Sequence, residues 1–162
     1  MFAGTPPLEA LRALVHEAAT IRQGESPEVK VVMSNDVSRA LFEAPAVRQV
    51  CVELPVEDTS SADNITDNVS HLRISLYGAR DAAMNWQEEV AGEMRKWGFK
   101  RGWYNPCLYW NQTNTLLTMV HGHDFVSVGS RDAAALFKQQ LEGRPKSSAH
   151  QSWCLTLAFT LT

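Results

Sequence analysis

Two imidazoles and a carboxylate stand close together in one short stretch of the chain. Residues 121–124 read His-Gly-His-Asp and lie between two runs rich in β-branched and apolar residues, at 115–120 and 125–129. Such runs are typical of paired strands, and Gly122 supplies the backbone freedom that a hairpin turn needs. The pattern therefore predicts a β-hairpin whose four-residue tip carries three side chains able to bind a metal ion or a proton: His121, His123 and Asp124.

A second carboxylate, Asp36, follows a short apolar run at 30–33 that predicts a buried strand. If this strand lies beside the hairpin in one sheet, Asp36 and Asp124 converge on a divalent ion. Oxygen ligands of this kind suit Mg²⁺, and paired metal ions clamp the phosphoryl group in polymerases and nucleases. Acids at strand ends also commonly face water, so the spacing alone leaves both interpretations open.

Zinc is a further option at the hairpin tip. His121 and His123, two residues apart, lie on one face of an extended strand, and this spacing can hold zinc. Asp124 is the one additional ligand nearby, so a zinc-dependent hydrolase at these three residues is a third hypothesis. Histidines in turns are more commonly just exposed to solvent. Ser127 and Ser130 lack the strand–turn–helix context of a hydrolase nucleophile, so a serine hydrolase is not supported.

The composition is that of one globular domain or a fragment of a larger one. The chain has 162 residues, of which 44% are hydrophobic and 20% charged. Its apolar runs are too short to span a bilayer and its N-terminus has no signal-peptide pattern, so we expect an intracellular protein, cytoplasmic or nuclear, with no membrane partner. The three cysteines are far apart and form no CxxC pair, which argues against a disulfide or a thiolate metal site.

The charge is unevenly distributed. The formal net charge is −3, whereas nucleic-acid-binding domains usually carry a basic face. Four basic residues nevertheless occur without an intervening acid between 95 and 103, interleaved with Trp97, Phe99 and Trp103. This basic stretch suits a phosphate backbone, or it is simply the solvated end of a helix. Its members are Arg95, Lys96, Lys100 and Arg101.

The elements that position these residues follow from hydrophobic periodicity. It predicts helices at 7–20, 82–97 and 131–141, a helical or turn segment at 37–44, strands at 30–33, 49–55, 71–77 and 107–110, the hairpin at 115–130, and a surface loop at 56–68. This order predicts an α+β fold, an antiparallel sheet with helices packed on one face. The tail, residues 145–162, ends in eight strictly alternating residues, a strand pattern whose partner the sequence does not identify.

The apolar stripes predict which helix faces are buried. In the first helix the stripe is Leu8, Leu11, Leu14, Val15 and Ala18. The last helix is predicted to pack through Ala135, Leu136 and Leu141. The middle helix is predicted to bury Ala83, Trp86, Val90, Met94 and Trp97, with Asp81 as N-cap and Gly98 at its C-terminal end.

Several sequence blocks, in order and in spacing, resemble one protein family. Residues 35–42 read NDVSRALF, 51–55 CVELP, 72–86 LRISLYGARDAAMNW, 97–100 WGFK and 105–109 NPCLY. Together they resemble the reverse transcriptase domain of copia-type retrotransposons, whose matching stretches read approximately Asp-Val-x-x-Ala-Phe, Val-x-x-Pro, Leu-Tyr-Gly-Leu-x-x-Ala-x-x-x-Trp, Gly-Phe and Asp-Pro-Cys-Leu-Tyr. The agreement covers about residues 5–141, and several blocks in register are more specific than any single motif.

The resemblance implies a polymerase palm with a ferredoxin-like core and part of the fingers over residues 1–144, followed by an atypical tail at 145–162. It implies an RNA-directed DNA polymerase, a nucleotidyltransferase that uses two Mg²⁺ ions, a template-primer and deoxynucleotides. Asp36 would be a metal ligand, and the family's Tyr-x-Asp-Asp turn would place its aspartates at His123 and Asp124. Leu41 would occupy the position of the aromatic residue that excludes a 2′-hydroxyl, and Gly78 would approach the nucleotide.

Three departures from the family pattern bear on activity. His123 replaces an aspartate, Leu41 replaces an aromatic residue, and the chain leaves no room for a thumb or RNase H segment, which would have to be supplied as partners. A unit charge about 4 Å from a metal ion is worth on the order of 4 kcal/mol at an effective dielectric constant near 20, or roughly a thousandfold in rate. Imidazole is also a poor ligand for Mg²⁺.

We therefore expect a truncated reverse transcriptase fold with little or no polymerase activity. The alternative is a non-catalytic protein, nucleic-acid-binding or structural, that keeps the palm and contacts nucleic acid through the basic stretch.

Overall fold

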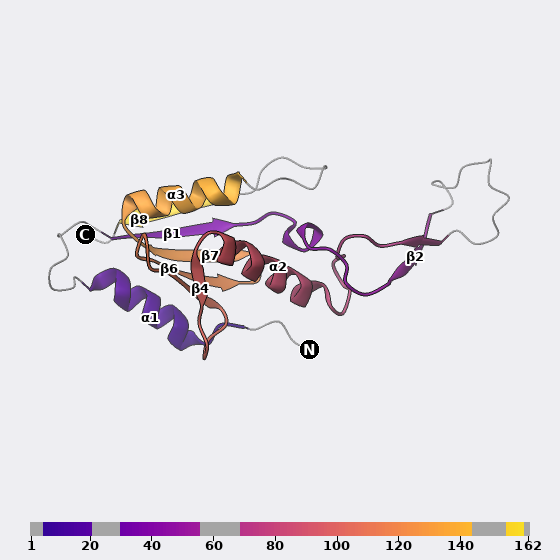
Figure 1. Cartoon of the computed structure of the whole chain (residues 1–162), viewed down its shortest axis with the longest axis horizontal. Helices are drawn as coiled ribbons and strands as arrows, with labels where there is room; N and C mark the ends of the chain where they lie inside the picture. The colour runs from indigo at the N-terminus through magenta and orange to yellow at the C-terminus, as the bar shows by residue number, and fades with distance from the viewer. Residues whose placement is uncertain (1–4, 21–29, 56–68, 144–154, 161–162) are drawn as a thin grey trace.

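The computed structural model describes residues 5–20, 30–55 and 69–143 and the backbone of 155–160. It has a mixed α+β architecture built on a six-stranded sheet in the order β4-β5-β6-β7-β1-β8, in which every neighbouring pair is antiparallel (Figure 1). The strands of this sheet are β1 (Val31–Asp36), β4 (Phe99–Arg101), β5 (Leu108–Asn111), β6 (Leu116–His121), β7 (Asp124–Gly129) and β8 (Leu155–Thr160). The predicted α+β class is confirmed.

Three α-helices and a short two-stranded ribbon complete the described structure. The helices are α1 (Leu8–Ala19), α2 (Ala82–Lys96) and α3 (Arg131–Glu142), with a 3₁₀ turn, η1 (Ala40–Glu43), after β1. The ribbon pairs β2 (Cys51–Glu53) with β3 (Val69–His71) and projects away from the main sheet (Figure 1). No helix within the described residues is both long and apolar enough to cross a membrane.

The hairpin predicted at 115–130 is present as β6 and β7. Strand β6 is shifted one residue toward the tip and β7 begins one residue earlier than predicted, because His121 and Asp124 pair with each other and leave only Gly122 and His123 in the turn. Gly122 has φ +60°, a conformation that glycine adopts at no steric cost. Thr118 and Ser127, opposite each other and fully buried, share a hydrogen bond of 2.9 Å between their hydroxyls, which fixes the register of the pair.

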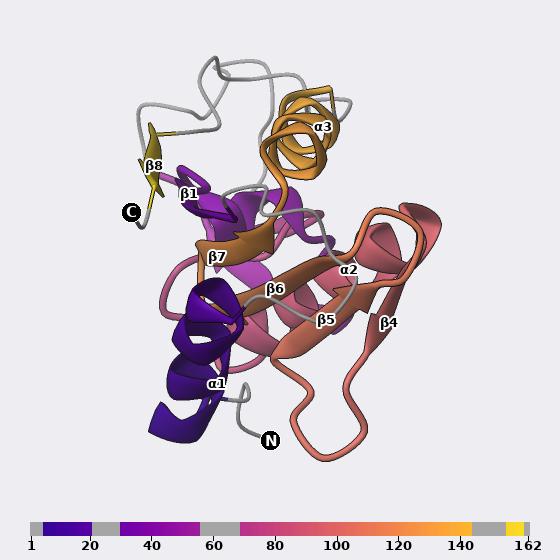
Figure 2. The same ribbon diagram turned by 90° about the vertical axis from the view of Figure 1, so that its left-hand side faces the viewer.

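Helices cover both faces of the main sheet, so the prediction that they pack on one face is wrong. Helices α2 and α3 cover one face and enclose the larger core, which includes Met33, Trp86 and Phe137. Helix α1 lies on the opposite face, where Leu14 packs with Val128 (Figure 2). The reason is that β1, β6 and β7 carry apolar residues on both sides, and a strand of this kind is stable only with both faces covered.

The apolar stripes of α1 and α3 are rotated relative to the prediction. In α1 the buried residues are Ala10 and Leu14, whereas the predicted Leu8, Leu11 and Val15 are exposed. In α3 the core residues are Ala133, Ala134, Phe137 and Leu141, so that of the predicted stripe only Leu141 is buried. In both helices alanines take the face nearest the sheet because their small side chains allow the helix to approach closely.

Helix α2 agrees better with its predicted boundaries. Trp86, Val90 and Met94 are buried as predicted, whereas Ala83 of the predicted stripe is exposed and Trp97 is partly buried; Gly98, just past the end, has φ +84°. The side chain of Asp81 makes no capping hydrogen bond and instead lies 3.5 Å from Arg48. The Asp81 side chain therefore forms an ion pair with the loop before β2 and does not cap the helix.

The strand predicted at 71–77 is wrong. Strand β3 ends at His71, and beyond it Ser75 is held by its backbone N–H, which donates to the carbonyl of Ala44. The buried Asn85 of α2 also donates to the Ser75 hydroxyl at 3.1 Å. The first of these bonds flanks a single β-bridge between Pro45 and Ile74, and the second joins Ser75 to α2.

The alternating tail forms a strand, as predicted, over Leu155–Thr160. Its partner, which the sequence did not identify, is β1. Residues 144–154 and 161–162, and the loop predicted at 56–68, lie outside the described residues.

Candidate metal centre

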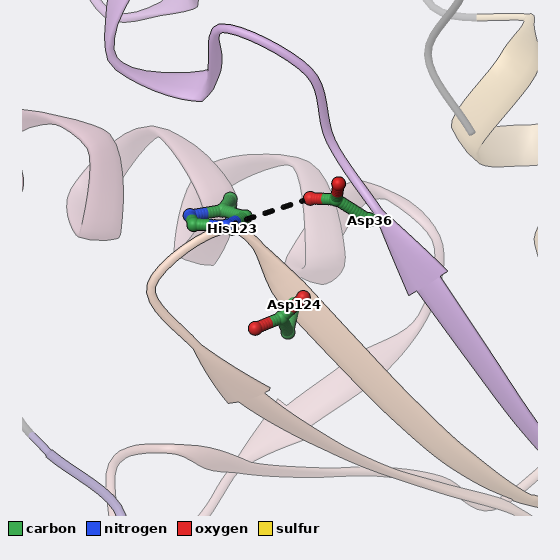
Figure 3. A group of neighbouring side chains, drawn as sticks. All are labelled: Asp36, His123 and Asp124. Carbon is green, nitrogen blue, oxygen red and sulfur yellow. Dashed lines mark ion pairs between the residues drawn. The ribbon is translucent and has the colours of Figure 1, made fainter. Parts of the chain in front are cut away.

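The end of β1 and the turn of the β6–β7 hairpin bring three potential metal ligands together. Asp36 is the last residue of β1, Asp124 is the first of β7, and the two are register partners in the ladder. His123 lies in the turn immediately before Asp124 (Figure 3). One ligand atom from each of the three side chains lies within 4.8 Å of the others. We call these three residues the tip group.

Two hydrogen bonds fix the backbone that carries the tip group. The N–H of Val37, one residue past Asp36, donates to the carbonyl of His123 at 3.1 Å. The indole N–H of Trp86 donates to the carbonyl of Gly122 at 2.7 Å, and the Trp86 ring is buried in the core. The tip is thereby fixed to both β1 and α2. Trp86 was predicted to be buried, but nothing in its spacing indicates contact with a turn 36 positions away.

The interaction between Asp36 and His123 is incomplete. Oδ1 of Asp36 is buried yet accepts no hydrogen bond from the described residues. Its nearest basic partner is Nε2 of His123 at 3.6 Å, which is too long for a hydrogen bond. The two side chains are 47% and 57% exposed, and an ion pair this exposed contributes at most about 1 kcal/mol. The pair therefore does little to satisfy the carboxylate.

His121 is not a member of the tip group. It is exposed at the end of β6 and pairs with Asp124 through the backbone ladder, but its imidazole is not among the clustered ligands. The structure thus assembles His123 and Asp124 with Asp36 rather than with His121, which differs from the triplet considered for a zinc hydrolase.

An apolar pocket of about 130 Å³ adjoins the tip. Leu41 and His123 both line it, so the residue predicted near the nucleotide sugar lies beside the tip group. Tyr77, Trp86 and Tyr109 contribute aromatic side chains to the wall, among mainly small and aliphatic residues. Burial raises the pKa of the Tyr109 phenol, an effect that the nearby Arg101 partly offsets, so Tyr109 stays a neutral wall residue at physiological pH.

Gly78 follows a pocket residue but does not itself line the pocket. It has φ +89°, and a Cβ built on it would meet no atom of the described structure within 4 Å. The preceding Tyr77 is oriented by an edge-on contact with Phe42, whose ring centroid is 5.1 Å away. The positive φ of Gly78 therefore allows the turn that follows the pocket residue Tyr77.

The basic stretch is largely engaged within the molecule. Arg101 donates to the carbonyl of Pro106 at 2.8 Å, pairs with Glu88 at 3.2 Å and lies over the ring of Tyr109 at 5.9 Å. Lys96 pairs with Glu93, and the guanidinium of Arg95 donates to the carbonyl of Ala91.

The aromatic residues of this region divide between core and surface. Phe99 is buried in β4, a strand that sequence analysis missed, and Trp97 packs against the same core. Trp103 is 90% exposed. Lys100 and Trp103 are the members of the region that point to solvent without a described ion pair or ring contact, so nucleic-acid binding here stays a prediction.

Comparisons of the chain with protein-family models, with curated proteins and with solved structures found no match. The resemblance to copia-type reverse transcriptases therefore remains a prediction from the sequence blocks.

Proposed function

We propose that this chain is the palm of a reverse transcriptase related to those of copia-type retrotransposons, with its polymerase activity strongly impaired by His123. The observation that supports it is the pairing of Asp36 with Asp124 at the junction of β1 and the β6–β7 hairpin. Sequence blocks suggested these two positions independently of any contact between them, and they lie opposite each other at the end of the ladder between two neighbouring antiparallel strands.

The donor set does not fit the two Mg²⁺ ions that the resemblance implies. Mg²⁺ takes oxygen ligands in near-ideal octahedral geometry. The tip group offers carboxylates from Asp36 and Asp124, but His123 contributes a nitrogen and no negative charge. Two metal ions held mainly by two carboxylates leave much of their charge uncompensated. The low activity of the proposed polymerase therefore follows from one residue, His123, which lacks the carboxylate charge.

The adjoining pocket supports the same proposal. Leu41 and Tyr77 line it together with His123, so a group bound in it would be next to the tip. An aliphatic Leu41 offers less bulk and rigidity than an aromatic ring against a 2′-hydroxyl. We expect any residual or restored synthesis to discriminate less sharply between deoxynucleotides and ribonucleotides than an enzyme with an aromatic residue there.

The test is primer extension with Mg²⁺ as the only added metal, in buffer treated to remove other metals. It compares the wild-type chain with His123→Asp. Restoring the carboxylate is expected to increase the extension rate by roughly a thousandfold. The double variant Asp36→Asn/His123→Asp is the matched control, because it regains one acid and loses another. It should be as slow as the wild type.

Two outcomes would contradict the proposal. Wild-type extension as fast as that of His123→Asp would show that His123 is no impairment. No extension by His123→Asp, in a variant that is folded and binds template-primer with strong salt dependence, would favour the alternative of a non-catalytic nucleic-acid-binding protein.

A further inference from the structure

The distance between Asp36 and His123 fits a shared metal ion as well as an ion pair. Oδ1 of Asp36 and Nε2 of His123 are 3.6 Å apart, with no hydrogen bond between them. Two atoms that bind the same zinc ion at about 2.1 Å in tetrahedral geometry are about 3.4 Å apart. The observed separation is therefore close to that of two ligands sharing one ion.

The chemistry of the donor set favours a metal of a particular class. One imidazole and two carboxylates form a three-ligand set with two negative charges, which neutralises a divalent cation. Imidazole suits zinc and its transition-metal neighbours, whereas Mg²⁺ prefers oxygen throughout. Sites with three protein ligands of this type leave a fourth position open for water. Because Asp36 and His123 are about half exposed, such a position can be reached from solvent.

The tip is also preorganised. The turn carbonyls of Gly122 and His123 are held by Trp86 and by the N–H of Val37, so two backbone segments that carry ligands are already fixed to each other. The three ligand atoms already lie within 4.8 Å of one another, so little further approach would place them on one ion.

We infer that the tip group binds one zinc-type divalent ion through Nε2 of His123 and one carboxylate oxygen each from Asp36 and Asp124, with water as the fourth ligand. This site takes the place of the two-magnesium site that the resemblance implies. It stands on the geometry of the tip and does not require the proposed polymerase function.

The experiment measures metal binding by the purified chain without nucleic acid. Chelator-treated protein is titrated with Zn²⁺, Co²⁺ and Mg²⁺ by calorimetry, and the Co²⁺ form is examined for the visible bands of a four-coordinate site. We expect one Zn²⁺ per chain, bound about 100-fold or more tightly than Mg²⁺. Asp36→Asn and His123→Ala are each expected to weaken zinc binding by about 100-fold.

Two control variants locate the site. His121→Asn alters an exposed histidine of the same hairpin that lies outside the tip group, and Cys51→Ser removes an exposed thiol. Both should leave zinc affinity within about twofold of the wild-type value, because neither residue is a ligand. His123→Asp should bind zinc less tightly and Mg²⁺ more tightly than the wild type.

Three results would overturn the inference: no zinc binding, which leaves Asp36 and His123 as an ion pair only; zinc binding lost in His121→Asn or Cys51→Ser; or equal affinity for Zn²⁺ and Mg²⁺. Each variant changes an exposed or half-exposed side chain, and circular dichroism checks that it is folded. Primer extension with Mg²⁺ alone tests the polymerase proposal separately, so failure of one proposal does not imply failure of the other.

Discussion

The tip group and the basic stretch were both predicted as candidate sites from charged and titratable residues. In the structure they differ in how far these residues are paired with other groups of the protein. At the tip, a buried oxygen of Asp36 faces His123 and accepts no hydrogen bond within the described structure. In the basic stretch, Arg101 has a carbonyl, a carboxylate and an aromatic ring as partners. The tip thus keeps a carboxylate oxygen without a hydrogen-bond partner in the described structure, whereas most of the charged groups of the basic stretch are paired within the molecule.

This difference separates side chains that are positioned for a ligand from side chains that support the fold. A buried polar atom without a partner costs free energy, and an ion bound to that atom would recover it. A cation already paired with three internal groups must give up those contacts before it can bind a phosphate. Changes at the tip should therefore alter metal binding, and changes in the basic stretch should alter stability.

The largest expected effect comes from the residue that joins the tip to the core. Trp86→Ala should lower the free energy of unfolding by about 3–5 kcal/mol, because it removes a large buried ring. Trp86→Phe retains most of the ring and removes the hydrogen bond to Gly122, so it should cost about 1–3 kcal/mol. Loss of this support should also weaken zinc binding by about tenfold. Chemical denaturation and zinc titration measure the two effects.

Phe137→Leu is the matched control for Trp86→Phe. It changes a fully buried ring of the same core from α3, whose ring contacts are with Trp97, Phe99 and Phe125. It should reduce stability by about 1 kcal/mol and leave zinc affinity unchanged. Equal loss of zinc affinity in the two variants would mean that the tip responds to general core damage and not to the Trp86 hydrogen bond.

A smaller effect is expected in the basic stretch. Arg101→Met keeps most of the aliphatic stem but removes the bond to the carbonyl of Pro106 and the contacts with Glu88 and Tyr109. It should cost about 1 kcal/mol of stability, since Glu88 is well exposed and that ion pair contributes little. Zinc affinity should not change. A large loss of nucleic-acid affinity at unchanged stability would instead assign Arg101 to a binding surface.

The smallest effect concerns the cysteine behind the basic stretch. Burial raises the pKa of the Cys107 thiol, and the charge of Arg101 partly opposes this. Because the thiolate is the reactive form, alkylation of Cys107 near pH 8 should be slower than that of the exposed Cys51, and should increase as the pH rises toward its raised pKa. Arg101→Met should slow it further. Mass spectrometry after timed iodoacetamide treatment measures both rates, and equal rates at Cys51 and Cys107 would contradict the expected protection.

The parts of the fold that the sequence predicted are those that depend on local pattern. The β6–β7 hairpin follows from two apolar runs around Gly122, and helix α2 follows from Trp86, Val90 and Met94 at helical spacing. Strand β4 was missed because it is only three residues long and follows the helix directly after Gly98. The position of α1 on the opposite face was missed because β1, β6 and β7 carry apolar residues on both sides, and this second apolar face was not recognised in the strand patterns.

The sequence predicted that Asp36 and Asp124 belong to the candidate site, but it did not predict the hydrogen bonds that hold the site in place. Asp36 and Asp124 each end or begin an apolar strand, which is a local signal, and their pairing required only that the strands be neighbours. The contacts that hold the tip link residues distant in sequence, such as Trp86 to Gly122 and Val37 to His123. The Ser75–Asn85 hydrogen bond is of the same kind. Such bonds depend on the final packing of the elements, which no spacing rule encodes.

The most direct test of the tip as a metal centre is a crystal structure of the zinc-loaded chain with anomalous scattering recorded at the zinc absorption edge. One anomalous peak is expected about 2.0–2.2 Å from Nε2 of His123 and from one carboxylate oxygen each of Asp36 and Asp124. A peak at Cys51 or His121 with none at the tip, or no peak at all, would contradict the assignment.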